Sequence, residues 1–217
     1  MNYLAHLLLS GPNLDRQVGG LLGDFVKGPL QGTYSPLVEQ GIRLHRQIDS
    51  VTNQMPQVAN LCTLFAPPWR RYAGIVIDIT FDHLLAQHWH EYHPMTLDKF
   101  CAVFYQHLRS HHHSLPESAR QFSMRAPGLR WLESYADADV VPVMLHRVGQ
   151  KLRKPVTLSE AWPLVLAHKA YFKEEFNSVM AELTVFAQRF IADYPTARDP
   201  RRSNSSPYQC TSSIISL

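Results

Sequence analysis

Helical periodicity recurs from the first segment of this chain to the last, whereas the alternation typical of strands is sparse. Apolar residues spaced three or four positions apart form one face of a helix, and that face must be buried against other helices. No apolar run is long enough to span a membrane. The pattern therefore predicts an all-α protein with no membrane association.

Start signals place two of the expected helices. Ser35 followed by Pro36 combines a capping side chain with a proline in the first turn, and the helix should run to about Thr52. The segment 157–160 (Thr-Leu-Ser-Glu) has the spacing of a capping box. It predicts a long C-terminal helix through Tyr194, bent at Pro163 or starting just beyond it.

The segment from Gly74 to Phe81 is rich in β-branched residues and would ordinarily suggest a buried strand. Its apolar pattern continues without a break through Leu84, Leu85 and Trp89, which is longer than a typical strand. We therefore predict a helix here.

Length and composition favour one domain. The chain has 217 residues, of which 45% are hydrophobic, enough for one sizeable core. We predict a helical domain over residues 1–195. The serine-rich segment 196–217 has too little apolar content to pack and is predicted to be a flexible tail.

The cysteines bear on the cellular compartment of the protein, and its net charge bears on the class of partner. Cys62, Cys101 and Cys210 are widely spaced and form no Cys-x-x-Cys pair, so they are expected to be reduced thiols in a cytoplasmic protein. The formal net charge of +3 is too small to indicate a nucleic-acid partner, although the pI of 8.8 suits an acidic one.

Candidate site residues lie on the helix that begins at Pro36. His45 and Asp49 fall on one stripe with Val38, Ile42 and Thr52, at spacings of three or four. Arg43 and Arg46 fall on another side of the same helix, where they could border solvent or a substrate.

A second pair of carboxylates belongs to the strand-like segment. If that segment is helical, Asp78 and Asp82 lie in a column of large apolar residues. Buried carboxylates must be paired, hydrogen-bonded or metal-bound, and two on one face repel unless a cation separates them. His83 is turned by about 100° from Asp82 on the helical wheel.

Asp24 lies in a glycine-rich apolar segment, and His6 lies in a short apolar segment near the start of the chain. Singly, each has an ordinary explanation, such as a core histidine or a helical His–Asp pair. Together, these histidines and aspartates favour a metal centre. Imidazole and carboxylate ligands without thiolates suit manganese, iron or magnesium, and zinc is also possible. His111 to His113, before Pro116, are expected to form a solvated cluster that binds metal adventitiously rather than a catalytic site.

Four motifs carry a family resemblance: residues 2–7 (Asn-Tyr-Leu-Ala-His-Leu), 20–25 (Gly-Leu-Leu-Gly-Asp-Phe), 45–49 (His-Arg-Gln-Ile-Asp) and 78–83 (Asp-Ile-Thr-Phe-Asp-His). In order and spacing they resemble bacterial acyl carrier protein phosphodiesterases, a divergent group of HD-type helical metal hydrolases. The resemblance implies hydrolysis of the phosphodiester that joins 4′-phosphopantetheine to a serine of holo-acyl carrier protein, with manganese preferred and magnesium or iron possible.

We assign each candidate site residue a role as a hypothesis. The metal ligands are expected to be His6, Asp24, His45, Asp78 and Asp82. Asp82, Asp49 and His83 are the expected catalytic residues, with His83 as the candidate general acid. Asp82→Ala should abolish hydrolysis in a protein that remains folded.

The acidic carrier protein should be drawn to a basic rim. Lys27, Arg43 and Arg46 are the expected substrate-binding residues, and Arg70, Arg71, Arg147, Lys151, Arg153 and Lys154 could extend the rim.

Two alternatives stay open. One is the same metal chemistry on a nucleotide or another small phosphoester. The other is a non-catalytic helical module that binds an acidic protein and uses its histidines and aspartates only for structure.

Overall fold

The computed structural model describes residues 3–194, and this part of the chain forms helices and turns without any strand. The all-α prediction is therefore confirmed. The helices are α1 (Tyr3–Leu9), α2 (Leu14–Leu22), α3 (Pro36–Thr52), α4 (Pro56–Thr63), α5 (Ala73–Gln87), α6 (Leu97–Ser110), α7 (Glu117–Arg125), α8 (Val140–Gln150), α9 (Trp162–Ala167) and α10 (Lys169–Asp193). Short 3₁₀ segments join several of them.

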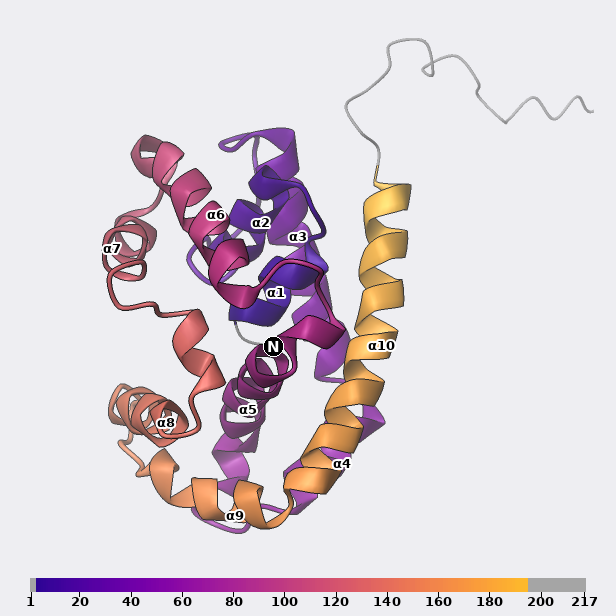
Figure 1. Ribbon diagram of the computed structural model, residues 1–217, viewed down its shortest axis with the longest axis vertical. Coiled ribbons are helices and arrows are strands. Elements are labelled where there is room, and N and C mark those ends of the chain that lie inside the picture. Colours follow the sequence, from indigo (N-terminus) through magenta and orange to yellow (C-terminus); the bar gives the residue numbers. More distant parts are fainter. Residues whose placement is uncertain (1–2, 195–217) are drawn as a thin grey trace, which may run out of the picture.

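The helices pack around α5, which runs through the middle of the molecule (Figure 1). The long helix α10 covers one side, where it contacts α3 and α4, while α6, α7 and α8 lie on the other side. The short helix α1 packs against both α2 and α5. This arrangement brings α1 into the centre of the fold.

Helix α3 begins and ends where the sequence predicts. The Ser35 side chain accepts a hydrogen bond from the backbone N–H of Val38, and Pro36 occupies the first turn. The predicted stripe faces inward, since Val38, Ile42 and His45 are buried.

Helices α2 and α3 cross with their backbones in contact. A Cβ atom added to Gly19 would lie 2.1 Å from the carbonyl oxygen of Val38, and one added to Gly41 would lie 2.2 Å from the carbonyl oxygen of Arg16. Any side chain at either position would force the helices apart. Glycine at both positions therefore fixes the close approach of α3, which carries His45 and Asp49, to α2, which ends just before Asp24.

The strand-like segment is helix α5, as predicted. Its buried residues cover nearly its whole circumference, including Val76, Ile77, Ile79 and Phe81. A helix that is apolar all round is a central one, which explains why this segment lacks the two-sided pattern of a surface helix.

The C-terminal prediction was partly wrong. Residues Leu158–Ala161 form a 3₁₀ segment, and the Thr157 side chain makes no capping hydrogen bond. Pro163 lies in the first turn of α9, and the chain breaks again at His168 before α10 begins. A 3₁₀ turn thus forms where the capping box predicts the first turn of an α-helix.

The predicted tail, residues 196–217, lies outside the described residues. Within residues 3–194, no helix combines the length and apolar character needed to cross a membrane.

Candidate metal centre

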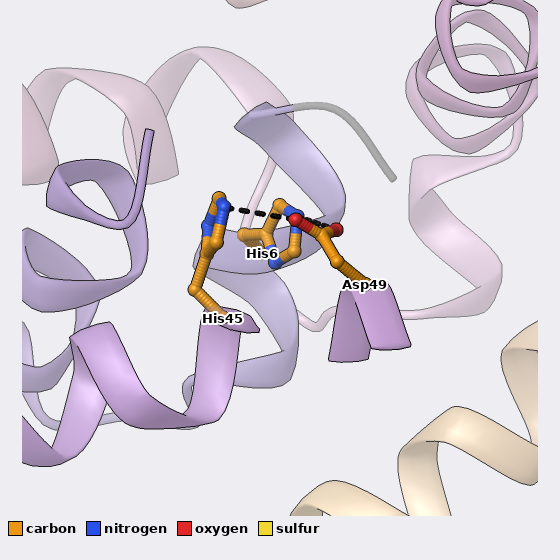
Figure 2. Close-up of side chains that lie close together, drawn as sticks. All are labelled: His6, His45 and Asp49. Atoms are coloured by element: carbon orange, nitrogen blue, oxygen red, sulfur yellow. Dashed lines mark ion pairs between the residues drawn. The ribbon is translucent and has the colours of Figure 1, made fainter. Parts of the chain in front are cut away.

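Three of the predicted residues meet between α1 and α3 (Figure 2). Nε2 of His6 lies 3.1 Å from one carboxylate oxygen of Asp49, and Nε2 of His45 lies 3.2 Å from the other. The two imidazole rings stack with their centroids 3.7 Å apart. Both nitrogens therefore face the same carboxylate.

The glycine-rich motif before Asp24 positions His45. A Cβ atom at Gly23 would lie 2.1 Å from Cγ of His45, so only glycine leaves room for this imidazole. Nδ1 of His45 lies 2.7 Å from the carbonyl oxygen of Gly20. Because a carbonyl can only accept, Nδ1 donates, which directs Nε2 toward the carboxylates. This is the usual way in which a histidine is oriented to bind a metal.

Asp24 extends the cluster. Its carboxylate lies 3.6 Å from Nε2 of His45. Burial alone would lower the pKa of His45, but its interactions with Asp24 and Asp49 outweigh burial and raise the pKa to about 9. Burial lowers the pKa of His6 to about 4, so this imidazole is neutral near pH 7.

The carboxylates of the cluster are ionised. Burial acts against the charge of Asp49, yet hydrogen bonds from His45 and His6 hold the pKa of this carboxyl well below its usual range. The pKa of Asp24 is also lowered, because His45 outweighs the effect of burial. In the absence of a metal, the proton on His45 is thus the positive charge between two carboxylates.

Asp78 lies beside this cluster. It lines a pocket together with Asp24. Burial raises the pKa of Asp78, and repulsion from Asp49 and Asp24 adds to the increase.

Asp82 has a different environment from the one expected of a ligand. It is fully buried, and its two carboxylate oxygens accept hydrogen bonds from the backbone N–H groups of Leu4, at 2.9 Å, and Ala5, at 3.1 Å. These amides belong to the first turn of α1, where N–H groups have no partner within the helix. Burial raises the pKa of Asp82 to about 7 although both hydrogen bonds oppose the increase. Asp82 therefore fastens α1, and with it His6, to α5.

The contacts of His83 are with a different part of the protein. Its Nδ1 donates to the carbonyl oxygen of Tyr135 at 2.7 Å, and its ring packs edge-on against Trp162. Burial lowers its pKa. These contacts explain the burial of His83 without linking it to His6, His45 or Asp49.

Basic side chains border the cluster on one side. A pocket of about 260 Å³ is lined by Lys27 and Arg46 together with Asp24, His45 and Asp49. The guanidinium of Arg46 is held by a hydrogen bond to the carbonyl oxygen of Val26. Arg43, the third expected substrate-binding residue, is exposed and pairs with Glu39 at 3.6 Å, and it does not line this pocket.

A second pocket, of about 310 Å³, shares Asp24 with the first. Arg147 and Lys151 supply its basic groups, and its remaining walls are largely apolar or aromatic. The sequence interpretation missed its aromatic residues, Tyr3, Trp131 and Tyr135, because they come from distant segments without a shared motif. A larger hollow, of about 420 Å³, contains none of the predicted site residues.

The donor set of the cluster fits a divalent cation. Ligand atoms of His6, His45 and Asp49 all lie within 4.8 Å of one another. The side chains of His6 and His45 are almost inaccessible to solvent, whereas that of Asp49 is 38% exposed, so an ion could enter past Asp49. Mixed imidazole and carboxylate ligands suit manganese, iron or zinc.

The raised pKa of His45 predicts a pH-dependent metal affinity. Below about pH 9, metal-free His45 carries a proton on Nε2 that an ion must displace. Lowering the pH should therefore weaken Mn²⁺ binding, by about tenfold per pH unit. Calorimetry between pH 6.5 and 8 in buffers of different ionisation enthalpy should also detect proton release of roughly one per ion. A pH-independent affinity would contradict this account of His45.

Comparison with known proteins gives a consistent answer. The family model described as acyl carrier protein phosphodiesterase matches residues 1–183. A protein of Pectobacterium atrosepticum with that name is 32% identical over 174 residues, which cover 80% of this chain and 90% of the relative. The Serratia proteamaculans protein of the same name is 35% identical, covering 71% of this chain and 80% of the relative.

A Salmonella newport protein, also named acyl carrier protein phosphodiesterase, is 34% identical and covers 81% of this chain and 92% of the relative. No solved structure matches the chain, so the likeness to HD-type hydrolases stays a prediction. By the extent of the family match and the identity to these relatives, the chain belongs to the acyl carrier protein phosphodiesterase family.

Proposed function

We propose that this protein hydrolyses the phosphodiester between 4′-phosphopantetheine and the serine of holo-acyl carrier protein, giving the apo-protein and 4′-phosphopantetheine. The observation that carries the proposal is the cluster of His6, His45 and Asp49 beside a pocket lined by Lys27 and Arg46. Family membership supplies the substrate class.

His6, His45, Asp49 and Asp24 would hold a divalent ion, for which Mn²⁺ is the first choice and Mg²⁺ or Fe²⁺ the alternatives. Such an ion, when bound, polarises a phosphoryl oxygen and lowers the pKa of water. The protein contributes the orientation of the ligands. Gly20 directs Nε2 of His45, and His6, which is neutral near pH 7, adds no positive charge that would repel an ion.

The two pockets that meet at Asp24 suit the two parts of the substrate. Lys27 and Arg46 can neutralise phosphate oxygens, since cationic side chains bind phosphate through charge-assisted hydrogen bonds. The second pocket, with aromatic walls and the polar groups of Tyr3 and Tyr135, suits an uncharged arm that carries amide groups. We assign the phosphate to the first pocket and the pantetheine arm to the second.

The direct test uses holo-acyl carrier protein as substrate. The full-length enzyme, stripped of metal and then supplied with Mn²⁺, should remove the phosphopantetheine group, which intact-mass spectrometry would detect. A chelator should stop the reaction, and Mn²⁺ should restore it. Unchanged mass of the carrier protein under these conditions would overturn the proposal.

The same experiment separates the alternatives. Turnover of nucleotides or simple phosphodiesters with no loss from holo-acyl carrier protein would favour the small-substrate hydrolase. Tight carrier-protein binding without any bound or activating metal would favour the non-catalytic module.

Charge reversal at the second pocket tests the basic rim. Arg147 and Lys151 are exposed one turn apart on and just after α8. Replacing both by glutamate should raise KM for the acidic carrier protein by about tenfold or more at low salt, with little change in kcat. The effect should shrink as salt increases.

Lys169→Glu combined with Arg189→Glu, at exposed positions on α10, changes the net charge by the same amount and is the matched control, which should leave KM unchanged. An equal effect of the control would show that net charge, rather than this rim, determines the affinity.

A further inference from the structure

A second group of histidines and an aspartate lies apart from the candidate centre. Nε2 of His107 and Nε2 of His111 lie 2.8 and 3.0 Å from the same oxygen of Asp15, and 3.3 Å from each other. Asp15 belongs to the first turn of α2, and the two histidines lie one turn apart at the end of α6. The group shares no residue with the cluster of His6, His45 and Asp49.

The structure corrects an expectation about these histidines. The sequence predicts that His111, His112 and His113 form one solvated cluster that binds metal only adventitiously. Instead, the imidazole of His111 turns toward α2 and joins His107, whereas His112 and His113 contact each other. The side chains of Asp15, His107 and His111 are only 33%, 28% and 23% exposed.

Hydrogen bonds alone do not explain why one oxygen of Asp15 and the Nε2 atoms of His107 and His111 lie so close together. If both Nε2 atoms donate to the single Asp15 oxygen, their two N–H groups converge at an N–N distance of 3.3 Å. If one Nε2 is unprotonated, its lone pair is directed at the carboxylate oxygen. A cation among the three atoms would accept a lone pair from each at once.

The spacing of these atoms fits a metal ion. Separations of 2.8, 3.0 and 3.3 Å allow one ion to lie on one side of their plane, at about 2.0–2.1 Å from each atom. Two imidazoles and one carboxylate would bind one side of the ion and leave its other coordination positions for water. This ligand set suits zinc and similar ions, whereas magnesium and calcium prefer oxygen ligands.

We propose that Asp15, His107 and His111 form a second binding site, for a divalent ion of the zinc type, that ties α6 to α2. The bond would link residues more than ninety positions apart in the sequence. Helix α2 also carries the Gly20 carbonyl that orients His45. The second ion would therefore brace the helix on which the candidate centre depends, without taking part in the reaction.

Metal stoichiometry tests the proposal. The full-length protein, stripped with a chelator, is dialysed against micromolar Zn²⁺, and bound zinc is measured by elemental analysis. His111→Gln and Asp15→Asn should each bind one equivalent less than the unmodified protein. His113→Gln, which alters a neighbouring histidine outside the group, should bind the same amount. Circular dichroism identifies any variant that fails to fold, in which case the other variant decides.

Asp49→Asn distinguishes this site from the proposed catalytic one. It should weaken metal binding at the candidate centre and retain the equivalent that depends on His111. Zinc should also raise the melting temperature of the His113→Gln protein more than that of His111→Gln. Equal zinc content and equal thermal shifts in the unmodified protein and both site variants would overturn the proposal, whatever the outcome of the hydrolysis assay.

Discussion

Asp49→Asn should lower kcat/KM for holo-acyl carrier protein by more than about a hundredfold, since replacing a group that only orients a metal ligand already costs about 10–100-fold. The two oxygens of Asp49 face Nε2 of His6 and Nε2 of His45 at 3.1 and 3.2 Å. Asparagine removes the negative charge and places an NH₂ group against one of these nitrogens. It therefore removes one of the proposed metal ligands and disturbs the other two.

Intact-mass assays at several Mn²⁺ concentrations would measure the effect. The variant should fold normally, because the Asp49 side chain is partly exposed and leaves no cavity. Asp98→Asn, at an exposed ion pair with Arg130, is the control and should retain full activity. Near-normal turnover by Asp49→Asn at saturating metal would remove Asp49 from the metal-binding set.

Asp82→Ala should destabilise the protein by about 2–6 kcal/mol, because two buried N–H groups lose their acceptor at about 1–3 kcal/mol each. Leu4 and Ala5 donate to the two oxygens of this fully buried side chain. Hydrolysis should fall as well, since α1 would no longer hold His6 in place. The two hydrogen bonds thus add a loss of stability to the sequence-based expectation of an inactive variant that remains folded.

Urea unfolding monitored by circular dichroism would measure this loss. Asp82→Asn keeps one acceptor oxygen and should lie between the alanine variant and the unmodified protein. Asp98→Ala, at an exposed position, should be nearly neutral. If Asp82→Ala is as stable as the Asp98→Ala control but inactive, the carboxylate acts in the reaction rather than by fastening α1.

Local signals in the sequence were sufficient to predict much of the fold. Ser35 and Pro36 predicted the start of α3 because capping depends only on neighbouring residues. The length of the apolar pattern identified α5 in spite of its β-branched residues. The capping box at Thr157 was wrong, because the same spacing is compatible with a 3₁₀ turn.

The site was predictable to the extent that its residues share helices or short motifs. His45 and Asp49 lie one turn apart, so their common face followed from helical spacing. The partners of Asp82 could not be predicted, because they are backbone amides more than seventy positions away. Similarly, the spacing of His107 and His111 was visible in the sequence, but their meeting with Asp15 depends on how α2 packs against α6.

The attachment of α1 to α5 has a consequence for how the protein is made. His6, Asp24, His45 and Asp49 are all present once the first 49 residues have been synthesised, but the carboxylate that fixes α1 belongs to Asp82. Because synthesis proceeds from the N-terminus, a nascent chain that ends before α5 has these side chains without the support that holds His6. Productive loading of the proposed metal should therefore wait until α5 has left the ribosome, which delays the capture of ions by an unfinished site.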